Sequence, residues 1–155
     1  MAISLASAVE NLCRCAGWKS MPPDDDGVYH FLLDGGLDLD LHSPDDRNCI
    51  ISTDLGPAPA DDDVSAEDEF VRLGNSAAAV MRAQRSILSL HDGRLALWRR
   101  ISLEASAEDF NSEVRQFLND QSWWRGRLDD SNANLSGSSL FSFDATGWMP
   151  GKLIF

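Results

Sequence analysis

The sequence has little of what a secreted, membrane-spanning or disulfide-bonded protein needs. No apolar run approaches the ~20 residues that cross a bilayer. The first apolar stretch has no basic residues before it and is interrupted by Glu10 and Asn11, so we expect no signal peptide. Only three cysteines are present, Cys13, Cys15 and Cys49. An odd number without a signal peptide favours reduced thiols in a reducing compartment, such as the cytoplasm.

Basic residues are also scarce. The chain has 13 Lys+Arg against 25 Asp+Glu, which gives a net charge of −12. This balance disfavours nucleic acid as a partner, because phosphate backbones are bound through Lys and Arg, and it disfavours anionic membranes for the same reason. Residues 1–70 carry 16 of the acids and only 3 bases. Such acidity either keeps the surface solvated or offsets an exposed apolar binding face.

Apolar spacing predicts three helices in a chain long enough for one domain. The first covers residues 5–16 and ends at Gly17, a natural helix stop. The second begins after Ser65, which forms a capping-box-like start with Asp68. The third begins after Ser106, and we expect it to end at Gly126.

Five strands are predicted between these helices. Residues 28–33, 37–41 and 48–55 are joined by short polar turns, which predicts an antiparallel meander. Asp92 and Gly93 join residues 87–91 to residues 94–103, a strong hairpin signal. The predicted order is α-β-β-β-α-β-β-α, an α+β fold with an antiparallel sheet and three helices. We predict a domain at 1–128 and a Ser/Gly-rich C-terminal tail with an apolar end at 129–155.

The sequence lacks the motifs of most enzymes and cofactor-binding proteins. His30, His42 and His91 have no zinc-site spacing, and there is no phosphate-binding glycine loop, so we predict no metal and no cofactor. His42 shares a strand face with Asp38 and Asp40, which is compatible with a small hydrolase. The same pattern is typical of the wet face of a half-exposed sheet.

Arg99 is the one basic residue in an apolar row. It has the same strand parity as Leu95, Leu97 and Ile101. An arginine in that position indicates either an interface or an ion pair with the acidic half of the chain.

Several segments resemble class I type III secretion chaperones of the Tir-chaperone type. They are residues 31–37 (FLLDGGL), the strand at 50–55 with its Gly56-Pro57 exit, the small-residue second helix and the hairpin at 88–98. The resemblance covers about residues 1–128. It implies a non-enzymatic homodimer that holds the N-terminal segment of a secreted effector in extended form and keeps it soluble. It adds the secretion ATPase as a further candidate partner. A regulator of the same fold, which sequesters a transcriptional regulator, is the alternative.

Candidate contact residues follow from this resemblance and from the apolar faces. An extended client can add a strand to a sheet edge while apolar pockets receive its side chains. The predicted effector contacts, each of which is alternatively a core residue, are Leu5, Val9, Leu12, Leu37, Leu39 and Leu41.

The candidate dimer interface lies in the second helix and the hairpin. The helix is rich in Ala and Gly, and Trp98 lies on the strand face opposite Leu95 and Leu97. This hairpin has two apolar faces, one more than the core of a monomer buries. We therefore predict that Val80, Met81 and Trp98 contact a second copy.

Overall fold

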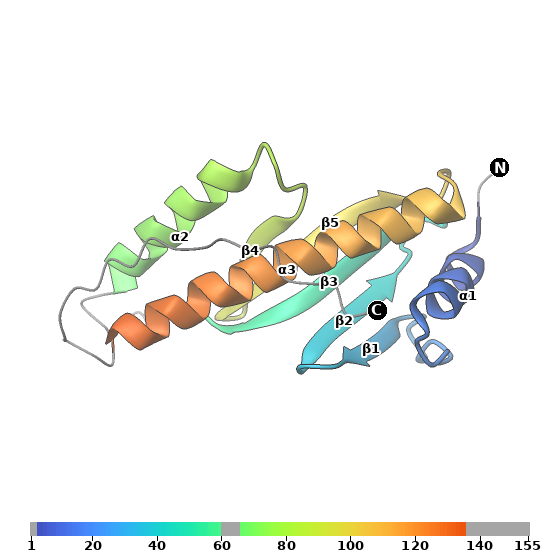
Figure 1. Ribbon diagram of the computed structural model, residues 1–155, viewed down its shortest axis with the longest axis horizontal. Helices are drawn as coiled ribbons and strands as arrows, with labels where there is room; N and C mark the ends of the chain where they lie inside the picture. Colours follow the sequence, from blue (N-terminus) through green and yellow to red (C-terminus); the bar gives the residue numbers. More distant parts are fainter. Residues whose placement is uncertain (1–2, 60–65, 136–155) are drawn as a thin grey trace.

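A computed structural model describes residues 3–59 and 66–135 as three helices and one five-stranded sheet (Figure 1). The predicted α+β class and the order of the elements are confirmed. The bounds are α1 Leu5–Ala16, β1 Tyr29–Leu33, β2 Leu37–His42, β3 Asn48–Pro57, α2 Ala66–Val80, β4 Ile87–His91, β5 Arg94–Ser102 and α3 Ala107–Leu135.

Helix α1 forms where the apolar stripe predicts it. The Ser4 side chain accepts a hydrogen bond from the backbone N–H of Ser7 at the helix start. Gly17 ends the helix with φ at 71°, a left-handed conformation that costs glycine little. The stripe packs on the sheet, and its buried residues are Ala8, Val9, Leu12 and Cys13.

All strand pairs are antiparallel, and the sheet order is β1-β2-β3-β5-β4. β1 and β4 are therefore the two edge strands of the described sheet. The β4–β5 turn is made by Asp92 and Gly93, whose φ values of 48° and 71° fit the predicted tight hairpin. β3 extends to Pro57, beyond the predicted end at Leu55, because a bulge between Asp54 and Gly56 lets the pairing with β5 continue.

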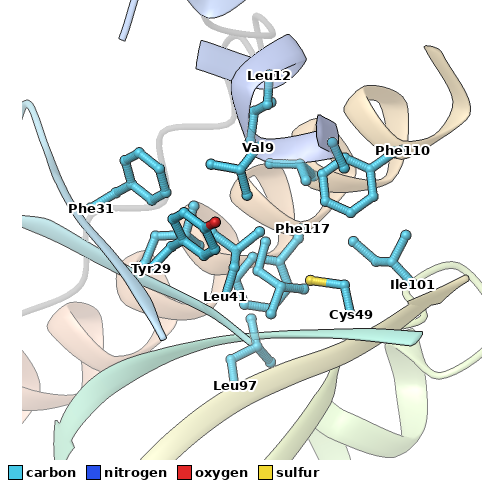
Figure 2. Close-up of a cluster of buried hydrophobic side chains, with 14 of the residues drawn as sticks. Val9, Leu12, Tyr29, Phe31, Leu41, Cys49, Leu97, Ile101, Phe110 and Phe117 are labelled. Atoms are coloured by element: carbon cyan, nitrogen blue, oxygen red, sulfur yellow. The ribbon is translucent and has the colours of Figure 1, made fainter. Parts of the chain in front are cut away.

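Helix α3 lies across the sheet, and α1 packs beside it at the β1 end (Figure 1). Figure 2 shows side chains from α1, α3 and the sheet meeting in one core, with Phe117 above Leu41 and Leu97. α3 supplies Phe110, Val114, Phe117 and Trp124, all at most 1% exposed.

The prediction that α3 ends at Gly126 is wrong. The helix passes through Gly126 and continues to Leu135. A glycine inside a helix costs about 1 kcal/mol relative to alanine, and Trp124 and Leu128 pack against the core on either side of it. The helix crosses the predicted boundary at 128, while the division into domain and tail stays a prediction. Residues 136–155 lie outside the described part of the chain.

Helix α2 packs much less than the other two. Only Ala66 and Leu73 of its residues are buried. Val71 is 57% exposed, and Met81, which follows the helix, is 71% exposed. Ser65, the predicted start of this helix, lies outside the described residues.

Candidate functional site: the two sheet edges and the polar face

The six predicted effector contacts divide into two groups. Val9, Leu12, Leu39 and Leu41 are at most 5% exposed and belong to the core. α1 and α3 cover that face of the sheet, and this burial favours the alternative that these four are core residues. Their contact with an effector stays a prediction. Both α1 and the Leu39/Leu41 face carry the alternation of a core, and sequence alone does not separate a core face from a binding face.

Leu5 and Leu37 are different, since both remain partly exposed. The structure also exposes apolar side chains that the sequence analysis did not single out. Leu32, on edge strand β1, is 78% exposed, and Met21, in the connection from α1, is 48% exposed. Leu32 faces away from the core because its strand neighbour Phe31 is buried. Its position out of phase with Tyr29 and Phe31 was the available sequence signal.

The other edge of the sheet also exposes apolar side chains. On β4, Ile87 is 48% exposed and Leu90 is 55% exposed. Ile87 is the cross-strand partner of Trp98, which is only partly buried on the face opposite Leu97. Of the predicted dimer contacts, Met81 and Trp98 are thus accessible, and Val80 is partly buried against the core.

Arg99 forms the buried ion pair that its apolar row indicated, but with other partners. Its guanidinium lies 3.1 Å from the Glu113 carboxylate and 2.8 Å from the Asp120 carboxylate, both on α3. The acidic half of the chain is not involved. Ser86 also donates to Asp120 at 2.5 Å, so one carboxylate joins β5, α3 and the segment that enters β4. Arg99 is 2% exposed, and the network fixes α3 on the sheet.

The polar face near β1 does not assemble the predicted His42 cluster. Asp40 accepts a hydrogen bond from His30 Nδ1 at 2.6 Å, because antiparallel pairing places these residues opposite each other. Within the described contacts, His42 makes no hydrogen bond or ion pair with Asp38 or Asp40. His30 Nε2 lies 2.9 Å from Asp24. These hydrogen bonds, first that to Asp24, raise the pKa of His30 above its ordinary value.

A cavity of about 300 Å³ opens between the end of β3 and the second half of α3. Three of its charged groups have partners: Arg94 lies 2.6 Å from Asp54, and Arg125 donates to the carbonyl of Gly36 at 3.1 Å. Its lining is Asp38, Asp54, Leu55, Gly56, Arg94, Arg125, Leu128 and Asp129. No nucleophile with a neighbouring base lines it, so it does not have the arrangement of an active site.

Neither a metal centre nor a membrane segment is found in the described part. No group of three or more His, Cys, Asp or Glu side chains there is placed to hold a metal ion. No helix in residues 3–59 and 66–135 is long and apolar enough to cross a bilayer.

Both edge strands of the described sheet expose apolar side chains, Leu32 on β1 and Ile87 and Leu90 on β4, and such edges are typical binding surfaces of protein-binding modules. The chain is a member of the Tir chaperone protein (CesT) family, whose family model matches residues 7–125. Its function is accordingly that of a chaperone for a type III secretion effector. The regulator and hydrolase alternatives receive no support. No curated protein sequence matches the chain.

Solved structures share this fold at low sequence identity. The crystal structure of the ExsC-ExsE complex is similar with a TM-score of 0.61 and 15% identity, covering 81% of this chain and 95% of that one. The HopA1-SchA chaperone-effector complex is similar with a TM-score of 0.58 and 19% identity, covering 77% and 91%. The Yersinia pestis secretion chaperone SycH, with a YscM2 fragment, gives 0.54 and 11%, covering 76% and 96%.

Proposed function

We propose that this chaperone binds the N-terminal segment of a type III effector in extended form along edge strand β1, without enzymatic activity, in the bacterial cytoplasm. The observation that carries the proposal is the exposure of Leu32, 78% accessible on a strand that pairs only with β2 in the described sheet. An edge strand presents unpaired N–H and C=O groups, which an extended peptide satisfies.

The surroundings of β1 suit such a client. Leu5 and Leu37 from the predicted contact set are partly exposed, as are Trp18 and Leu33. We assign direct contact with the client to these side chains and to Leu32. Val9, Leu12, Leu39 and Leu41 support this surface from the core beneath it. Burial of apolar area dominates such binding, so its affinity resists salt.

We further propose a homodimer at the opposite edge. Ile87, Leu90 and Met81 expose apolar side chains at β4 and at the end of α2, and Trp98 lies beside Ile87. A poorly packed helix next to an uncovered edge strand is the expected surface for a second copy. This interface leaves β1 of each protomer free for the client. The secretion ATPase stays a candidate second partner.

Two matched variants test both proposals, Leu32→Lys on β1 and Leu90→Lys on β4. Each puts a charge at an exposed leucine of an edge strand, so neither should unfold the chain. The effector is first identified by mass spectrometry of what co-purifies from the native host. Affinity for its N-terminal segment is measured by titration calorimetry, and oligomeric state by sedimentation.

We expect Leu32→Lys to weaken client binding roughly tenfold and to keep the dimer, because burial of one leucine contributes about 1.5 kcal/mol or more. Leu90→Lys should weaken the dimer and leave the affinity for the client unchanged. Equal affinity of Leu32→Lys and the wild type for the client would refute the β1 site. A 17.0 kDa species alone at micromolar concentration would refute the dimer. If the co-purified protein is a DNA-binding regulator, the regulator alternative replaces the effector.

A further inference from the structure

The connection from α1 to β1 is fixed to the sheet at two points. At its start, the ring of Trp18 packs on Phe31, with centroids 5.6 Å apart. Near its end, the Asp24 carboxylate reaches His30 on the opposite face of β1, 2.9 Å from Nε2. The same carboxylate organises the turn that enters the strand, because its other oxygen accepts from the backbone N–H groups of Asp26 and Val28 at 3.0 and 2.8 Å.

The geometry of His30 requires a particular protonation state. Both ring nitrogens lie within hydrogen-bond distance of carboxylate oxygens, Nε2 at 2.9 Å from Asp24 and Nδ1 at 2.6 Å from Asp40. An ionised carboxylate only accepts, and a neutral imidazole donates from one nitrogen alone. Only the imidazolium satisfies both contacts at once.

We propose that Asp24, His30 and Asp40 form a pH-sensitive clasp that holds the turn at residues 24–28 on the sheet and releases it when His30 loses its proton. Asp24 is the partner that leaves. Asp40 is fixed opposite His30 by the pairing of β1 with β2, whereas Asp24 belongs to a loop. A neutral His30 keeps its Nδ1 proton on Asp40 and turns the lone pair of Nε2 toward Asp24, which repels that carboxylate.

Further titratable side chains lie on the connection and on β2. The connection contributes Asp25 and Asp26, and β2 contributes Asp38 and Asp40 on the face of His30; His42, also on that face, is the other titratable base. The pKa of His30 is raised, chiefly by the hydrogen bond that it donates to Asp24 and then by the one that it donates to Asp40. The pKa of Asp24 is lowered, chiefly by His30 and then by the amide of Val28.

The pH range in which the clasp is closed follows from these two pKa shifts. The stabilisation due to His30 is complete below its ordinary pKa of 6.5 and is lost as the pH rises through the raised value. The contribution of Asp24 is present above its ordinary pKa of 3.8 and is lost as the pH falls through the lowered value. The clasp is therefore closed between the lowered pKa of Asp24 and the raised pKa of His30.

Nuclear magnetic resonance on the full, client-free chain tests the clasp whether or not the proposed client site is correct. The histidine ring signals give the titration of His30, and hydrogen exchange of the Val28 amide reports the turn. Asp24→Asn keeps an oxygen for the turn amides but removes the charge, and Asp25→Asn is the matched control. His30→Ala removes the clasp itself.

We expect His30 to titrate above 6.5 and to shift downward in Asp24→Asn but not in Asp25→Asn. Protection of Val28, corrected for the intrinsic pH dependence of exchange, should fall through the His30 midpoint in the wild type and show no such step in His30→Ala. Titration of His30 at or below 6.5 would overturn the proposal, as would equal shifts in both asparagine variants or a Val28 step that persists without His30.

Discussion

Helix α1 buries Ala8, Val9, Leu12 and Cys13 within 12 residues, whereas α2 buries only Ala66 and Leu73 within 15. The two helices flank different parts of one sheet, and their sequences are similarly apolar. The buried side chains of α1 belong to the hydrophobic core of the chain. α2, β4 and the segment between them instead leave Val71, Met81, Ile87 and Leu90 about half exposed or more.

This difference indicates that different kinds of interaction stabilise the two regions. The α1 region is stabilised by buried apolar area within the chain. The segment from α2 into β4 is attached to α3 mainly through polar groups: Ser86 on Asp120, and Arg85 on Glu113 at 3.2 Å. An apolar surface without an internal partner is where a second chain gains most by binding.

Loss of the Asp120 carboxylate should have the largest effect on stability. This carboxylate joins α3 both to Arg99 on β5 and to Ser86, in the segment between α2 and β4. In Asp120→Ala, Arg99 stays buried with Glu113 as its remaining acid and Ser86 loses its acceptor. Loss of one partner of a buried ion pair costs about 3–5 kcal/mol. Chemical denaturation should show a decrease of that order. Asp120→Asn, which keeps an acceptor oxygen, is the control and should lose less; a loss under about 1 kcal/mol in Asp120→Ala would mean that solvent compensates Arg99.

A pair of truncations compares the two helices directly. Leu12→Ala removes a side chain that is 5% exposed and should lower the free energy of unfolding by about 2–5 kcal/mol. Val71→Ala, at a site 57% exposed, should change the stability of the monomer by less than about 0.5 kcal/mol. Denaturation at low protein concentration measures both. Equal losses would show that α2 is part of the core, against the burial described above.

The sequence predicted the helices and strands better than it predicted the contacts between them. The α1 stripe and the Asp92-Gly93 turn are local signals, and both elements form as predicted. The exposure of Leu32 depends on which strand occupies the edge, and the His30–Asp40 contact depends on register, so neither is encoded within one segment. Arg99 was identified as unusual, yet its acids on α3 come close only after the helix crosses the sheet. The predicted helix end at Gly126 was wrong because packing on both sides of this residue outweighs the low helix propensity of glycine.

The smallest expected effect is a change in the rate at which the cysteines are labelled. These rates compare how tightly the α1 region and the α2 region are packed. Burial raises the pKa of Cys49, on β3, to about 12 and raises that of Cys13, on α1. Thiolate is the reactive form, so both should react with a small disulfide reagent only when the structure opens. Cys15 is exposed and should react at once. Mass spectrometry of timed samples in Leu12→Ala should then show faster labelling of Cys13, which lies beside the lost side chain. Val71→Ala should leave the rate of Cys13 unchanged. Rapid labelling of Cys13 in the wild-type protein would contradict a closed α1 core and would place both ends of the sheet in the same loosely packed state.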